Sequence, residues 1–142
     1  MLYLLLSGLI LAGCKAIKTV GDKKNAVKLY RISGVPERAT AYQPGKLYIA
    51  DYEVLNTYAL DDSAQFKLEQ ILASPALIMK DINRNCEFFP AFALKWPSGK
   101  VILMSLSPCA KIQVIEKVND GTPVDDLKEH SELESWVMAL AK

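Results

Sequence analysis

Residues 86–109 read CEFFPAFALKWPSGKVILMSLSPC, and this stretch sets the architecture of the chain. Two segments rich in aromatic and aliphatic residues, Glu87–Trp96 and Val101–Ser107, flank a Pro-Ser-Gly turn at positions 97–99. Proline fits the second position of a type I turn, and glycine takes the left-handed conformation that a following bulge requires. The pattern therefore predicts a β-hairpin.

The two cysteines of this stretch bracket the predicted hairpin. Pairing Trp96 with Lys100 places Cys86 opposite Ala110, one residue from Cys109. The chain has one further cysteine, Cys14, which lies in an N-terminal segment typical of proteins that fold outside the cytoplasm. In such proteins the two remaining cysteines usually form a disulfide. Closing a loop of this length stabilises a fold by ~3 kcal/mol. A redox-active pair would favour Cys-x-x-Cys spacing or a positive microenvironment, and neither is visible. We therefore predict a structural disulfide.

The first strand of the hairpin is apolar on both faces, which predicts a strand inside the sheet with cover on both sides. One face carries Phe88, Phe92, Leu94 and Trp96, and the other carries Phe89, Ala91 and Ala93. Outside the hairpin, alternating and apolar segments predict further strands at Val27–Ile32, Lys46–Leu60 and Lys111–Val118.

Two helices are expected. Asp62 followed by Gln65 indicates a capped helix through Ala73, and residues 76–83 stay open between helix and strand. Thr122-Pro123 has an N-cap residue followed by proline at the first helical position, so Val124–Lys142 is expected to be helical.

A second capping box, Ser131 with Glu134, leaves open whether this C-terminal region is one helix or two. Its apolar stripe, expected to pack on the sheet, is Leu133, Trp136, Val137 and Leu140. The predicted fold is a single α+β domain over residues 26–142. It has an antiparallel sheet of about four to five strands, a middle helix and a C-terminal helix, with one hairpin closed by a disulfide.

The N-terminus has the pattern of a targeting sequence. Leu11-Ala12-Gly13-Cys14 ends an apolar run and resembles the lipobox of bacterial lipoproteins. The resemblance implies a signal peptide over residues 1–13, cleavage before Cys14, and acylation of that cysteine. The apolar run Leu2–Ala12 would rise only ~16 Å as a helix, against a hydrocarbon core of ~30 Å, so it is too short to span a bilayer.

An acylated Cys14 would be held stably, because a processed lipoprotein cysteine carries three acyl chains and two already suffice. Lys15 rather than Asp follows it, which in such lipoproteins implies the outer membrane. Residues 14–25 form a basic tether. It is either a soluble, flexible link or a segment that gains about 1 kcal/mol per cation from anionic lipid.

A second resemblance concerns the hairpin itself. The pattern Cys86-Glu87-Phe88-Phe89-Pro90, then a glycine turn and a strand ending in Cys109, resembles small, mostly uncharacterised secreted and lipid-anchored bacterial proteins. It implies an extracytoplasmic α+β domain closed through its hairpin, and no established activity comes with it.

Three tyrosines fall on one face of the predicted strand Lys46–Leu60 by parity: Tyr48, Tyr52 and Tyr58. An exposed tyrosine row would form a contact surface for a partner protein of the envelope, because tyrosine combines apolar area with a polar tip. The competing interpretation is that the rings cover the edge of the core and send their hydroxyls to solvent.

Candidate catalytic residues are few. His130 is the single histidine, and it could bind metal only together with Cys86 and Cys109, if these were not bonded to each other. Asp51 and Glu53 share a face of the predicted strand, as a general acid and base might, although such alternation more often faces water. We expect no metal, no cofactor and no catalytic residue.

The net charge and the motifs of the chain argue against a nucleic-acid-binding protein. The formal net charge is +1, and the chain has no glycine-rich phosphate loop and no aromatic–basic alternation, so nucleic acid is not expected as a partner. The sequence predicts a lipid-anchored protein of the bacterial cell envelope that acts as a binding, accessory, inhibitory or immunity module. The alternative is a small envelope hydrolase, or a carrier for a cell-wall or lipid ligand.

Overall fold

The computed structural model describes residues 26–80, 82, 84–117 and 121–142, and the predicted signal peptide, the tether and Cys14 lie outside the described residues. Within this part, one sheet of seven strands has the order β2-β3-β1-β4-β5-β6-β7. The elements in chain order are β1 (Lys28–Pro36), η1 (Ala39–Ala41), β2 (Tyr48–Ile49), β3 (Tyr52–Ala59), α1 (Asp62–Leu72), β4 (Phe92–Lys95), β5 (Val101–Met104), β6 (Lys111–Ile115), β7 (Val124–Asp126) and α2 (Glu132–Leu140).

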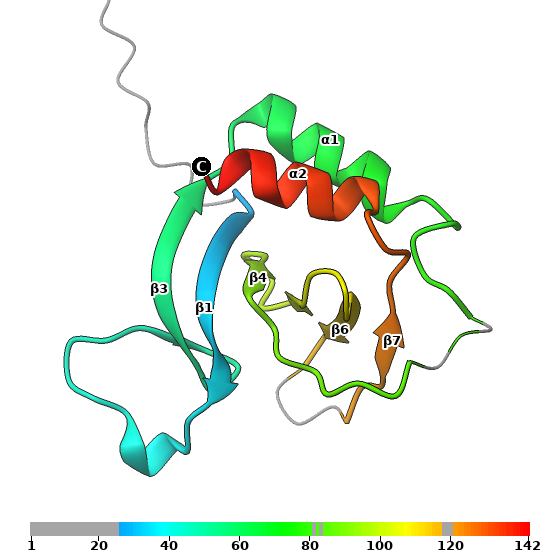
Figure 1. Ribbon diagram of the computed structural model, residues 1–142. Coiled ribbons are helices and arrows are strands. Elements are labelled where there is room, and N and C mark those ends of the chain that lie inside the picture. The colour runs from blue at the N-terminus through cyan, green and yellow to red at the C-terminus, as the bar shows by residue number, and fades with distance from the viewer. Residues whose placement is uncertain (1–25, 81, 83, 118–120) are drawn as a thin grey trace, which may run out of the picture.

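The sheet is antiparallel throughout and curls, and the two helices lie next to each other at one end of it (Figure 1). The predicted α+β class is therefore confirmed. The strand number was underestimated, for two reasons. A turn at Ala50-Asp51 divides the expected strand Lys46–Leu60 into β2 and β3, and β7 forms in a segment expected to be helical.

The predicted helix start at Thr122-Pro123 is wrong. Val124–Asp126 pairs with β6 instead, so long-range strand pairing overrides the local capping signal. The helix begins after Ser131, whose hydroxyl accepts the backbone N–H of Glu134 while the Glu134 carboxylate accepts that of Ser131. The second capping box therefore marks the start of one short helix, and its predicted apolar stripe does pack on the core.

The central hairpin has the predicted register. Lys95 lies opposite Val101, and the Trp96 N–H donates to the Lys100 carbonyl at 2.9 Å. The strands are shorter than expected, since β4 begins at Phe92. Because residues 86–91 do not continue the strand, Phe88 does not share a face with Phe92 and packs on the opposite side of the sheet.

Two hydrophobic clusters lie on the two faces of the sheet. The larger one includes Leu29 and Leu94 from the sheet and Leu68 and Val137 from the helices. The smaller one lies on the other face. Its members are Tyr30, Ile32, Ile49, Tyr52, Ala93, Val101 and Leu103. Strand β4 contributes to both clusters, which confirms cover on both sides for this part of the predicted strand. Before β4 the predicted alternation is wrong, because Phe89 is exposed and Ala91 packs against the larger cluster instead of sharing a face with Ala93.

Strand β3 contains a bulge that reverses which face its residues occupy. Arg31 lies opposite Asn56, whereas the next residue of β1, Ile32, lies opposite Val54, so one residue of β3 has no partner. Beyond the bulge, the Thr57 N–H donates to the Asn56 side-chain oxygen at 2.8 Å. Among the described residues no strand pairs with the outer edge of β3 after this point.

Helix α1 begins one residue earlier than predicted. Asp61, not Asp62, is the N-cap, and its carboxylate accepts the Ala64 N–H at 2.7 Å. Leu68 and Ile71 are its buried residues. Neither helix within the described residues has the length and hydropathy needed to cross a bilayer.

Candidate functional site

The predicted disulfide is present. Cys86 and Cys109 are bonded, with their Cα atoms 6.4 Å apart across the open end of the β4–β5 hairpin. The alternative in which both cysteines bind a metal with His130 is therefore excluded. No group of three or more candidate ligands lies together in the part of the chain that the structure describes.

Near the disulfide, a largely buried ionic cluster fixes Arg84 to β6 and β7. The Arg84 guanidinium donates to the carbonyls of Ala110 and Leu127, at 3.2 and 3.0 Å. The Lys111 ammonium donates to the Arg84 carbonyl at 2.9 Å, and the Arg84 N–H donates to Asp126. The second Asp126 oxygen lies 3.6 Å from the Lys111 ammonium. Because these bonds connect separate chain segments, we assign a structural role to this cluster.

A polar surface with several side-chain hydrogen bonds lies elsewhere, at the end of the sheet farthest from the helices (Figure 1). Tyr42, in the connection between β1 and β2, stacks on Tyr48 with ring centroids 3.9 Å apart and an interplanar angle of 4°. Two carboxylates hold the hydroxyls: Tyr42 donates to Asp51 at 2.5 Å, and Tyr48 donates to Glu37 at 3.2 Å. We call these four residues the tyrosine tip.

The backbone around the tyrosine tip is equally constrained. Ala50 and Asp51 both have positive φ, so the turn between β2 and β3 is tight, and it presents the Asp51 carboxylate to Tyr42. The Gln43 N–H donates to the Tyr48 hydroxyl at 3.1 Å, and Lys46 pairs with Glu53 at 2.8 Å. An exposed surface that is already ordered loses little conformational entropy when it binds.

The electrostatics of the tip follow from these contacts. The hydrogen bond to Asp51 raises the pKa of Tyr42 to about 12, because the nearby carboxylate disfavours a phenolate. The hydrogen bond to Glu53 raises the pKa of Lys46 in the same region. Each carboxylate therefore has its own neutral or cationic donor, and the tip offers hydrogen-bonding groups rather than a proton-transfer pair.

The three tyrosines predicted to form one row do not share a face. Tyr48 lies before the Ala50-Asp51 turn, and its ring joins the tyrosine tip. Tyr52 is buried in the smaller cluster, and burial raises the pKa of its hydroxyl. Tyr58 lies beyond the bulge and packs against the larger cluster. The predicted row is wrong because both the turn and the bulge interrupt the alternation of the strand.

The sequence analysis missed Tyr42, which is the partner of Tyr48. The available signal was the pair of tyrosines on either side of Pro44-Gly45, since a turn there brings the flanking chain together. Periodicity did not reveal it because Tyr42 belongs to no strand.

Asp51 and Glu53 do not form an acid–base pair. Asp51 lies in the turn rather than on a strand, and its carboxylate accepts from Tyr42. Glu53 is in β3 and binds Lys46. Since the two carboxylates have separate partners, the geometry gives them no shared reaction centre.

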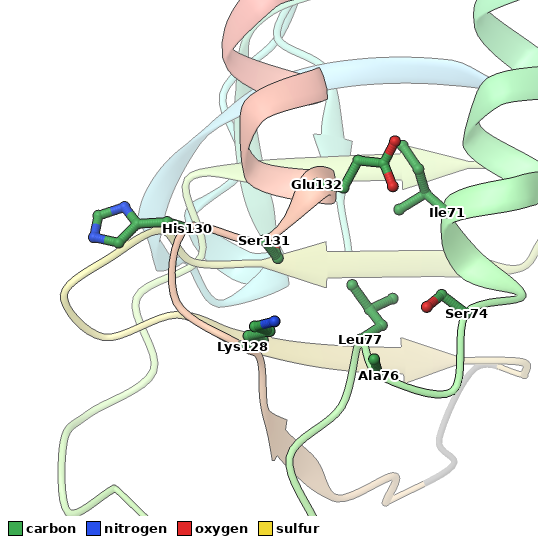
Figure 2. Close-up of a pocket in the computed structure, with 8 residues that line it drawn as sticks. All are labelled: Ile71, Ser74, Ala76, Leu77, Lys128, His130, Ser131 and Glu132. Atoms are coloured by element: carbon green, nitrogen blue, oxygen red, sulfur yellow. The ribbon is translucent and has the colours of Figure 1, made fainter.

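A small open depression lies between the end of α1 and the chain that leads into α2, with a cavity volume of about 190 Å³ (Figure 2). Ile71 and Leu77 contribute its apolar wall, and Lys128 and Glu132 its charged rim. The His130 ring points away from the other side chains in this view. Glu132 is also paired with Lys67 of α1. The depression can accept a few atoms of a ligand, but it does not bring a nucleophile and a base together.

Comparison with known proteins identifies no relative. No family model, no curated protein and no solved structure matches the chain.

Proposed function

We propose that this protein is a lipid-anchored binding module of the bacterial cell envelope, with an accessory, inhibitory or immunity role, and that the tyrosine tip is its contact surface. The observation that carries the proposal is the order of the tip. Neither Tyr42 nor Tyr48 belongs to a hydrophobic cluster, yet stacking and hydrogen bonds fix both rings. The fold does not need this order, whereas recognition benefits from it.

The position of the tip supports the same proposal. The described chain starts beside α1, where the Val27 N–H reaches the Gln65 side chain at 3.4 Å. From there β1 leads to the tip, and its nine residues extend ~30 Å. If Cys14 is acylated, the tip therefore projects away from the lipid, where a partner protein of the envelope can reach it.

Two exposed aliphatic side chains add apolar area next to the tip. Val35 precedes Glu37 at the end of β1, and Leu47 precedes Tyr48; both are more than half exposed. Aromatic anchors with neighbouring aliphatic contacts are the usual composition of an interface core.

The anchor is tested first. Cys14→Ala should give a chain that no longer partitions with membranes, and the parent should carry acyl chains on a mature N-terminal Cys14 by intact mass spectrometry. Continued membrane association of the variant would contradict the lipid anchor.

The contact surface is tested by crosslinking in intact cells, with a photoreactive residue replacing Leu47. A specific partner should be captured by the parent and lost in Tyr42→Ala and Tyr48→Ala. The control is Lys128→Gln, on the rim of the depression, which should leave capture unchanged. Capture that survives both tyrosine changes but is lost in the control would move the site to the depression. That result would favour the alternative, a carrier or hydrolase for a cell-wall or lipid ligand.

A further inference from the structure

We infer that the opposite end of the domain rests on anionic lipid headgroups, through Lys28, Lys95 and Trp96. We call these three residues the lysine end. The inference rests on the proposed lipid anchor, because the anchor is what brings this end to the bilayer. It adds a second membrane contact, made by the folded domain itself.

Two lysines face each other across neighbouring strands at this end. Lys28 of β1 lies directly opposite Lys95 of β4. Side chains in such a pair stand on the same face with Cβ atoms about 5 Å apart, and like charges in this arrangement are destabilising. Among the described residues neither ammonium has an ion-pair partner. An anionic surface would relieve this repulsion and would supply the missing counter-charge.

The carboxylates near this end are the main opposing charges. Glu116 pairs with Lys100 at 3.2 Å. Asp61 caps α1, where its carboxylate accepts the Ala64 N–H, and Asp62 follows it in the first turn. Glu116 and Asp61 therefore have partners within the domain, whereas Lys28 and Lys95 do not.

Trp96 provides the amphipathic group. It is half-buried, packs against the larger hydrophobic cluster, and has the Lys100 ammonium 5.5 Å from its ring centroid. Tryptophan and lysine side chains side by side are typical of the boundary between headgroups and water. Lys28 and Lys95 alternate with Leu29 and Leu94 of the larger cluster. The two lysines therefore point to the other face of the sheet from Trp96. The three residues meet a common surface only at the end of these strands, so we infer that the domain contacts the lipid end-on.

The link to Cys14 is short enough to allow this contact. About twelve residues span at most ~40 Å even when fully extended, so an acylated Cys14 would keep the start of the domain near the bilayer. Confinement at this range raises the effective concentration of the lipid surface. Weak contacts therefore suffice. A lysine near an anionic surface strengthens binding to that surface about five-fold, so the pair strengthens it about 25-fold.

The experiment uses the two tryptophans of the chain as reporters. The full-length lipidated protein is reconstituted into phosphatidylcholine vesicles, with and without phosphatidylglycerol, that carry brominated acyl chains. In Trp136→Phe the fluorescence comes from Trp96 alone, and in Trp96→Phe it comes from Trp136 of α2. We expect quenching of Trp96 in the anionic vesicles, reduced at high salt, and weaker quenching of Trp136.

The decisive variant is Lys28→Gln with Lys95→Gln, which should abolish the quenching of Trp96. The matched control is Arg38→Gln with Lys46→Gln, which removes the same charge beside the tyrosine tip and should leave quenching intact. Quenching that is equal in zwitterionic vesicles, or unchanged in the Lys28/Lys95 variant, would overturn the inference. So would its absence from protein that remains in the vesicle fraction. Protein that separates from the vesicles would instead contradict the anchor, and the inference would fall with it.

Discussion

Different interactions stabilise the β4–β5 and β2–β3 hairpins. In the β4–β5 hairpin, both strands have four residues and bury nearly all of their side chains against clusters on both faces of the sheet. The second hairpin has a two-residue strand at the edge of the sheet, and it buries Ile49 and Tyr52 in the smaller cluster. Its tyrosine tip, in contrast, is held by side-chain hydrogen bonds and one aromatic stack. Burial therefore holds the first hairpin, whereas polar contacts outside both clusters hold the tip of the second.

The difference separates stability from recognition. Hydrophobic burial is the dominant stabilising contribution in a fold, whereas exposed hydrogen bonds and ion pairs contribute little. Changes in the β4–β5 hairpin should therefore lower the free energy of unfolding, and changes in the tyrosine tip should alter binding and local titration. The following predictions test this division, from the largest expected effect to the smallest.

Truncation of a leucine should distinguish the two hairpins most clearly. Leu94 of β4 is 0% exposed, whereas Leu55 of β3 is 56% exposed. Leu94→Ala should lower the free energy of unfolding by about 3–4 kcal/mol, because it leaves a cavity. Leu55→Ala should change it by less than about 0.5 kcal/mol. Urea unfolding measures both, and equal losses would contradict the comparison.

Loss of the disulfide should lower the free energy of unfolding slightly less than Leu94→Ala does. Cys86→Ser and Cys109→Ser should each lower the free energy of unfolding by about 3 kcal/mol, because either change opens the same loop. The double variant should be no less stable than either single one. Additive losses in urea or thermal unfolding would show that each cysteine acts independently.

Glu134 should show the effect of one buried carboxylate that joins the β5–β6 connection to α2. It accepts from the backbone N–H groups of Ser107 and Ser131 and from the Ser107 hydroxyl. Glu134→Gln should cost about 1–3 kcal/mol, because an amide cannot accept all of these bonds. The control is Glu132→Gln in the same turn, whose exposed carboxylate pairs with Lys67 and should contribute less than about 1 kcal/mol. A larger loss for the control would contradict the assignment.

A change in the tyrosine tip should alter the pH titration of Tyr42 while leaving the free energy of unfolding nearly unchanged. Tyr42 has a pKa of about 12, raised above the ordinary value of 10 by its hydrogen bond to Asp51. A raised tyrosine pKa favours the folded state below pH 10, and this contribution disappears as pH rises toward 12. Asp51→Asn should lower the Tyr42 pKa toward 10 in an ultraviolet absorbance titration, with urea unfolding nearly unchanged. Tyr42→Phe identifies the transition, because it should remove that titration step.

The comparison also explains what the sequence could predict. The hairpin, its register and the disulfide followed from residues that are close in the chain and apolar on both faces. The tip did not, because Tyr42 meets Asp51 through a loop that has no periodicity. Strand β7 was read as a helix because Thr122-Pro123 is a valid local start signal, and only pairing with β6 overrides it. The tyrosine row failed at the bulge, where one unpaired residue reverses the alternation of β3.

The bulge and Asn56 bear on how molecules of this protein behave at high density. Lipid-anchored proteins are concentrated in two dimensions, and an open strand edge is a template for edge-to-edge aggregation. Residues 54–59 carry no charged side chain to prevent such pairing. The Asn56 side chain instead occupies the Thr57 N–H, and the bulge disrupts a flat edge. If the proposed lipid anchor concentrates the protein at a membrane surface, Asn56 and the bulge would protect this part of the β3 edge from pairing with a second copy.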